Sequence, residues 1–185
     1  KARILQATME LLKAIEGEEI RPQLLDTPLR VQRALIEMLD GYDTNIDSLF
    51  KSFDGEGKGQ VVITRNIGTF SICEHHLLPF QVCASVAYLP KDRVIGVSKM
   101  ARLVRAYAHR LQLQERLTEQ IGYALMEHLK PQGAGVIIVG KHLCMRARGV
   151  KDSESEVVTS VMLGNFRESS ELKQEVISLM GIARD

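Results

Sequence analysis

Two clusters of potential metal ligands, far apart in the chain, place the strongest constraint on its fold. The first cluster, Cys73-Glu74-His75-His76, holds one thiol, one carboxylate and two imidazoles in consecutive positions. The second cluster, His142-Leu143-Cys144, offers thiol and imidazole again. Cys thiolate and His nitrogen are common ligands of Zn²⁺, and open zinc sites use three protein ligands. One shared site requires a fold that brings the clusters together, with Cys73, His76 and Cys144 as the ligands.

Two histidines, His75 and His142, remain beside this ligand set as candidate proton carriers.

A lone Cys is more often a small buried apolar residue than a ligand. Cys83, in an apolar run without a neighbouring His, is assigned to that class. A structural zinc site in a binding module stays open as an alternative, although a closed site of four ligands would also need His75 or His142.

Length and composition indicate a globular protein of one domain with a small N-terminal appendage. The chain has 185 residues, of which 45% are apolar and 25% are charged, and these are ordinary values for a folded domain. No apolar run approaches the roughly 20 residues that span a bilayer. Three Cys do not form a disulfide framework of the kind found in secreted domains. We therefore expect a cytoplasmic enzyme with no membrane partner.

Basic residues bracket the two clusters, although the net charge is only +1. Between Lys91 and Arg116 there are seven Lys or Arg and two acids. Scattered cations of this kind suit a phosphate-bearing ligand, and a solvated helix face is the alternative. With four Tyr, five Phe and no Trp there is little aromatic surface for base stacking. We expect no nucleic-acid partner.

Hydrophobic periodicity predicts an α+β protein. Helices are predicted over residues 2–16, 27–39, 98–110, 113–129 and 171–180. Strands are predicted over residues 60–72, 80–89, 136–139 and 157–163. The third strand is expected to continue and to carry, on one face at a period of two, His142, Cys144, Arg146 and Arg148. Residues 54–59 are expected to form a flexible turn, because they lack the spacing of a phosphate loop.

Five groups of residues follow one another in a specific order. They are Cys73-Glu74-His75-His76, residues 94–99 (VIGVSK), residues 112–118 (QLQERLT), His142-Leu143-Cys144 with Arg148-Gly149, and Thr159-Ser160 with Leu163-Gly164. Together they resemble the GTP cyclohydrolase I family, from about residue 27 to residue 179. The resemblance implies a tunnelling fold, an antiparallel four-stranded sheet with two helices packed on one face. Residues 1–55 would form an N-terminal helical segment and residues 56–185 the catalytic domain.

The reaction of that family converts GTP and water into 7,8-dihydroneopterin triphosphate and formate, as the first step of folate-type or tetrahydrobiopterin-type pterin biosynthesis. The resemblance implies Zn²⁺ on Cys73, His76 and Cys144, which activates water for attack on C8 of guanine. His75 and His142 would move protons during ring opening. The family also assembles homodecamers from two pentamers.

The resemblance further implies a set of substrate-binding residues. The base, ribose and triphosphate of GTP would be bound by Glu115, Gln114, Ser98, Lys99, Arg102, Arg148 and, from a neighbouring subunit, Arg30. A carboxylate at Glu115 suits the N1–H and the exocyclic amine of guanine, which are both donors. The alternatives are that Glu115 only stabilises a helix dipole and that Arg30 is only a solvated cation.

Two other kinds of enzyme are alternatives to this family. Dihydroneopterin aldolase and the 7-deazaguanine nitrile reductase share the implied fold but do not need the zinc triad. Zinc-dependent deaminases carry an H-x-E and a C-x-x-C signature, and neither pattern occurs in this chain.

Overall fold

The computed structural model describes residues 2–54 and 59–181. Its contacts divide the chain into two compact units, Lys1–Asp40 and Gly41–Asp185. Most of the predicted turn at residues 54–59 lies outside the described residues. None of the helices in the described ranges combines the length and the apolar character that a membrane span requires.

The first unit consists of two helices that pack on each other, α1 (Ala2–Glu16) and α2 (Thr27–Met38). Gly17 follows α1 with a φ of +99°, the left-handed conformation that commonly ends a helix. Pro28 lies in the first turn of α2, where its missing N–H costs no helical hydrogen bond. Both helices were predicted from the sequence, and α1 has the predicted bounds.

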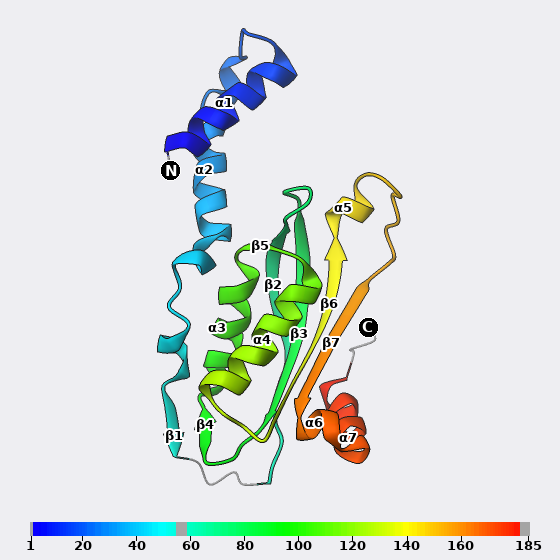
Figure 1. Cartoon of the computed structure of the whole chain (residues 1–185). Coiled ribbons are helices and arrows are strands. Elements are labelled where there is room, and N and C mark those ends of the chain that lie inside the picture. Colours follow the sequence, from blue (N-terminus) through cyan, green and yellow to red (C-terminus); the bar gives the residue numbers. More distant parts are fainter. Residues whose placement is uncertain (1, 55–58, 182–185) are drawn as a thin grey trace. The chain divides into compact units, whose positions relative to one another are not determined.

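The second unit is built on a five-stranded sheet with the order β5-β2-β3-β6-β7 (Figure 1). Its four long strands are antiparallel to their neighbours: β2 (Val62–Cys73), β3 (Pro79–Leu89), β6 (Gly133–His142) and β7 (Val157–Gly164). The fifth strand, β5 (Leu111–Gln112), runs parallel to the end of β2 and places Gln112 opposite Cys73. The prediction of a purely antiparallel four-stranded sheet is therefore corrected to a mixed one. A strand of two residues is too short to show a hydrophobic period.

A second, small sheet pairs β1 (Ser52–Asp54) with β4 (Arg93–Ile95). Helix α3 (Val97–Ala108) follows β4, and helix α4 (Gln114–His128) follows β5. Both helices pack on one face of the large sheet, as predicted, with apolar side chains every three to four positions. Their buried residues include Met100, Leu103, Val104, Leu117, Ile121 and Leu125.

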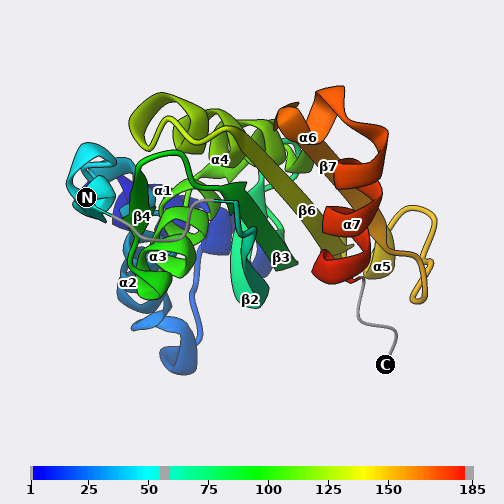
Figure 2. The same cartoon turned by 90° about the horizontal axis from the view of Figure 1, so that it is seen from below.

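The opposite face of the sheet carries two more helices, α6 (Asn165–Glu168) and α7 (Ser170–Met180) (Figure 2). Strand β3 is buried on both faces: Val86 and Tyr88 belong to the core under α3 and α4, while Ala87 and Leu89 pack with Phe166 and other residues of the second core. This explains why residues 80–89 show a nearly continuous apolar run rather than an alternation.

The predicted continuation of the third strand beyond His142 is wrong. Strand β6 ends at His142, and residues Leu143–Arg146 form the short helix α5. The last pair between β3 and β6 is Phe80 with His142, and β7 pairs only as far as Gly140. Without a neighbouring strand on either side, the backbone satisfies its polar groups in a helical turn instead. Cys144 therefore does not share a strand face with His142.

Candidate metal centre and active site

A tight turn between β2 and β3 positions Cys73 and His76. The backbone N–H of Cys73 donates to the carbonyl of Leu78 at 2.9 Å, and the N–H of Leu77 donates to the carbonyl of Cys73 at 2.9 Å. Leu77 closes the turn with a φ of +52°. The turn brings His76 back over the end of the strand, so that its Nδ1 lies 3.8 Å from the Cys73 sulfur.

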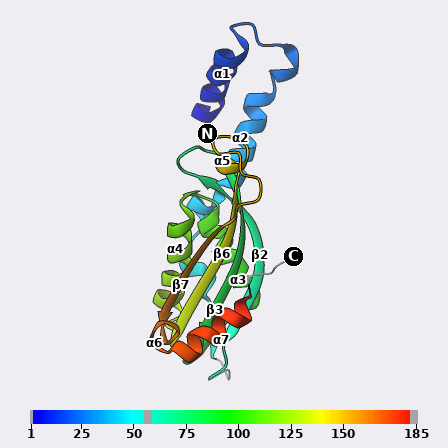
Figure 3. The ribbon, with the colours of Figure 1, turned by 90° about the vertical axis from the view of Figure 1, so that its right-hand side faces the viewer.

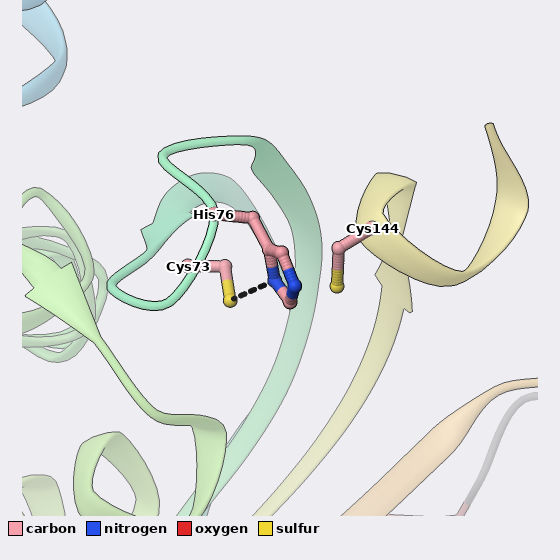
Figure 4. Close-up of side chains that lie close together, drawn as sticks. All are labelled: Cys73, His76 and Cys144. Atoms are coloured by element: carbon pink, nitrogen blue, oxygen red, sulfur yellow. Dashed lines mark hydrogen bonds between the residues drawn. The ribbon is translucent and has the colours of Figure 1, made fainter. Parts of the chain in front are cut away.

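Cys144 reaches the same place from α5. The turn after β2 and α5 lie at one end of the large sheet, opposite the end at which α6 lies (Figures 1 and 3). The ligand atoms of Cys73, His76 and Cys144 all lie within 4.8 Å of one another, and the Cys144 sulfur faces the His76 ring (Figure 4). The predicted triad is thus brought together as a group that could hold a metal ion.

The chemistry of this donor set suits a soft divalent cation. Burial raises the pKa of the Cys144 thiol, and the neighbouring Cys73 thiol raises it further. A bound cation reverses this effect because it favours the thiolate form. Two sulfurs and one imidazole are typical ligands of zinc. Arg148 lies at the same site, where its Nη1 donates to His76 Nε2 at 3.2 Å.

His142 lies at the end of β6, between an aromatic ring and an amide. Its imidazole stacks on the ring of Phe80, with centroids 4.3 Å apart and planes at 6°. Its Nε2 lies 2.9 Å from Oε1 of Gln114. Burial lowers the pKa of His142, and the negative charge of Glu115 partly opposes this effect. The environment therefore favours the neutral imidazole near pH 7.

The start of α4 supplies the residues beside His142. Glu115 lies in the first turn, as predicted, and its side chain is exposed. Gln114 is buried, with 2% of its surface exposed. Arg116 forms an ion pair with Glu74 of the turn after β2. His75 is exposed, and its ring meets the His76 ring edge-on with centroids 6.2 Å apart.

Comparisons with known proteins identify the family. The family model described as GTP cyclohydrolase I matches residues 4–181. The chain belongs to the GTP cyclohydrolase I family.

Curated members of the GTP cyclohydrolase I family are similar over most of the chain. GTP cyclohydrolase 1 of Synechococcus sp. (strain JA-2-3B'a(2-13)) is 47% identical over 94% of this chain and 76% of that protein. GTP cyclohydrolase 1 of Caldanaerobacter subterraneus subsp. tengcongensis is 42% identical over 100% of this chain and 98% of that protein. Membership of this family makes the protein an enzyme, a hydrolase.

One solved structure, archaeosine synthase QueF-Like in the apo form, is 19% identical and covers 57% of this chain and 93% of that chain. Its TM-score of 0.44 is too low to support an inference about this protein.

Other residues that the GTP cyclohydrolase I resemblance assigned to GTP are not brought to the metal ligands within one chain. Ser98, Lys99 and Arg102 lie in the first half of α3, whereas the end of α3 leads into β5 beside Cys73. A helix of 12 residues is about 18 Å long. Lys99 donates from Nζ to the carbonyl of Lys51.

Arg30 belongs to the other unit of this GTP cyclohydrolase I family member. It lies near the start of α2, is exposed, and forms an ion pair with Asp26 at 3.5 Å. The pair offsets the unfavourable position of a cation at a helix N-terminus.

Sequence reasoning missed the hydrogen bond between Gln114 and His142 and two further contacts of the site. One is the stack of Phe80 on His142, and the other is the ion pair of Arg116 with Glu74. All five residues lie in or beside the motifs shared with the GTP cyclohydrolase I family, but no local pattern signals contacts over such separations in sequence.

Proposed function

We propose that the protein converts GTP and water into 7,8-dihydroneopterin triphosphate and formate, a step of pterin biosynthesis, and that it depends on Zn²⁺. The observation that carries this proposal is the convergence of the ligand atoms of Cys73, His76 and Cys144 within 4.8 Å in a member of the GTP cyclohydrolase I family. These three residues would hold the ion. When bound there, Zn²⁺ supplies Lewis-acid activation of water near neutral pH.

His142 serves as the principal acid and base. It lies two residues before Cys144 without belonging to the group of Cys73, His76 and Cys144, and its lowered pKa keeps an unprotonated ring nitrogen available at neutral pH. It takes up and returns protons on the purine nitrogens while the imidazole ring of guanine opens and C8 leaves as formate. His75 acts as a second proton carrier, which its exposed position beside His76 permits.

Glu115 recognises the guanine base. Its exposed carboxylate lies close enough to His142 for its charge to influence the pKa of the imidazole. It accepts hydrogen bonds from the N1–H and the exocyclic amine, a pair of donors that adenine does not offer. Arg148, at His76 Nε2, binds the triphosphate.

Neighbouring copies of the chain complete the site in a homo-oligomer, a decamer of two pentamers. This part of the proposal is supported by the position of Ser98, Lys99 and Arg102 in the first half of α3, because the opposite end of that helix leads into β5 beside Cys73. From a neighbouring copy, Ser98 contacts the ribose, and Lys99, Arg102 and Arg30 bind the triphosphate.

The test is to incubate the zinc-loaded protein with GTP and to follow formate together with a fluorescent pterin after oxidation, with ATP as the control substrate. Formate and pterin from GTP alone are expected. Absence of both products at full zinc occupancy would contradict the proposal.

Absorption spectra of the cobalt-substituted protein distinguish a three-ligand site with bound water from the closed four-ligand site of a structural metal.

A further inference from the structure

We propose that Gln114 is a positioning residue that holds the imidazole of His142 in a single tautomer, with hydrogen on Nε2 and the acceptor at Nδ1. This inference deepens the proposed function and rests on it, because it concerns the residue to which proton transfer is assigned. It differs from the role in substrate binding that the family resemblance implies for Gln114.

The neighbours of Gln114 define which end of its amide is nitrogen. Its Nε2 lies 3.1 Å from the carbonyl oxygen of Ile138 and 2.8 Å from that of Val157. Carbonyl oxygens only accept hydrogen bonds, so the group facing them must be the NH₂. The opposite end of the amide is then the oxygen, which only accepts. His142 Nε2, at 2.9 Å from that oxygen, must therefore be the donor.

A hydroxyl network supports the same amide orientation. Thr118 Oγ1 donates to the backbone carbonyl of Gln114 at 2.8 Å, so its hydrogen is committed. Thr159 Oγ1, 2.6 Å from Thr118 Oγ1, must then donate to it. Thr159 keeps its lone pairs for Gln114 Nε2, at 3.2 Å. The two hydrogens of Gln114 Nε2 are thus shared among three acceptors, the carbonyls of Ile138 and Val157 and the hydroxyl of Thr159, and all three require the NH₂ at this end of the amide.

The hydrogen on Nε2 determines the role of the other ring nitrogen, Nδ1. A neutral imidazole carries one hydrogen, so a hydrogen on Nε2 makes Nδ1 the acceptor. Within residues 2–54 and 59–181, Nδ1 of His142 has no hydrogen-bond partner. The atom that exchanges protons with the substrate is therefore Nδ1.

The backbone at Gly140 is adapted to this contact. A Cβ atom at position 140 would lie 2.0 Å from Gln114 Oε1 and 3.2 Å from His142 Nε2. Only glycine lets the amide approach the strand so closely. The stack on Phe80 restrains the plane of the ring, while Gln114 sets which edge of the ring carries the hydrogen.

The test compares Gln114→Leu with Gln112→Leu in the full-length, zinc-loaded protein. Gln112 is equally buried, at 2% exposure, but its amide donates to Tyr107 and Gln120 rather than contacting His142. The readouts are kcat and KM for GTP, zinc content, and the ¹⁵N imidazole spectrum. The chain has five His, and the signals of His142 are those missing from His142→Ala.

We expect the wild-type His142 signals to report hydrogen on Nε2, and Gln114→Leu to produce a mixture of tautomers. In Gln114→Leu, kcat should fall about 10- to 100-fold, as is usual when a supporting partner is removed. KM should stay within about twofold, because ground-state binding is not affected. Gln112→Leu should leave the His142 signals unchanged. Gly140→Ala should reproduce the tautomer mixture, since its Cβ displaces the amide.

Three results would overturn the inference. The first is hydrogen on Nδ1 in the wild-type protein, a measurement that needs no variant to fold. The second is an unchanged tautomer in Gln114→Leu. The third is a raised KM with kcat unchanged, which would make Gln114 a substrate-binding residue. A wild-type protein that releases no formate from GTP would instead contradict the proposed function, and the tautomer measurement would still be valid.

Discussion

Arg116 holds the carboxylate of Glu74 with two nitrogens: its Nη1 lies 2.6 Å from Oε2 and its Nη2 lies 3.1 Å from Oε1. This pair joins the turn that carries Cys73 and His76 to the start of α4, where Gln114 and Glu115 lie. The hydrogen bond from Arg116 lowers the pKa of Glu74, which keeps the carboxylate ionised and the pair intact at neutral pH. The turn of the proposed metal ligands and the residues assigned to the base are thus linked by one bidentate contact.

Replacement of Arg116 should loosen the metal-binding turn. Exposed ion pairs contribute little to stability, so Arg116→Met should raise the dissociation constant for zinc by only up to about fivefold, measured by competition with a chelator. Lys141→Met is the matched control, because Lys141 forms a similarly exposed pair with Glu156 at 3.1 Å that does not touch the turn. Equal zinc affinities of Arg116→Met and the wild-type protein would show that the pair does not support the turn.

Loss of either thiol ligand should remove the metal. In Cys73→Ser and Cys144→Ser we expect most bound zinc to be absent by elemental analysis. Turnover should fall by more than the about 10- to 100-fold that removal of an outer-shell partner costs. Cys83→Ser should change neither quantity, because Cys83 lies within β3 opposite Gly68 and Val139. Full zinc occupancy in both ligand variants would exclude the triad.

Removal of the His142 side chain should slow the chemical step without weakening the binding of zinc or GTP. His142→Ala should lose about 10²- to 10⁴-fold in formate release, the usual contribution of a positioned acid or base. Zinc content and the affinity for GTP should be retained, because His142 is not part of the ligand group. His128→Ala, at a histidine that pairs with Asp47, is the control. Near-normal formate release from His142→Ala would contradict the assignment of proton transfer to His142.

Glu115 should determine the choice of base. Leaving the guanine donors unpaired costs about 1–3 kcal/mol, so Glu115→Ala should weaken GTP binding about 5- to 150-fold by calorimetry. Glu119→Ala, at an exposed acid one turn further along α4, should bind GTP normally. If Glu115→Ala still preferred GTP to ATP as strongly as the wild-type protein, Glu115 would only stabilise the helix dipole.

Activity should partly return when Cys144→Ser is dissociated and reassembled together with either Arg102→Ala or Arg30→Ala. Cys144→Ser lacks a metal ligand, whereas Arg102→Ala and Arg30→Ala lack cations that we assign to a neighbouring copy. In a random mixed oligomer, about a quarter of shared sites combine intact residues from both chains, so up to about that fraction of the wild-type rate should return.

Cys73→Ser mixed with Cys144→Ser is the control for this experiment. Both substitutions fall in the ligand group of a single chain, so no site in that mixture is intact. If oligomers shown by mass to contain both Cys144→Ser and Arg102→Ala stayed inactive, the site would be confined to one chain.

Local sequence patterns were sufficient to predict α1, α2, α3, α4 and α7, the four long strands, and the group of Cys73, His76 and Cys144 that could hold a metal ion. The apolar period of α4 and the β-branched run of β7 extend over enough residues to identify each element. Cys73 and His76 lie three positions apart, so one turn can present both, and the chain offers few other soft ligands.

The surroundings of Cys144, Gln114 and His142 could not be predicted from local patterns, because they depend on contacts between segments that are distant in the sequence. Strand β6 ends at His142 because β3 pairs with it no further than His142 and β7 no further than Gly140, so Cys144 lies in a helical turn rather than in a strand. Gln114 meets Ile138, Val157 and His142 only because α4 packs across β6 and β7. Periodicity describes which face of one element is apolar, but hydrogen bonds between elements depend on where each element begins, ends and packs. The packed structure therefore decides which ring nitrogen of His142 carries the hydrogen.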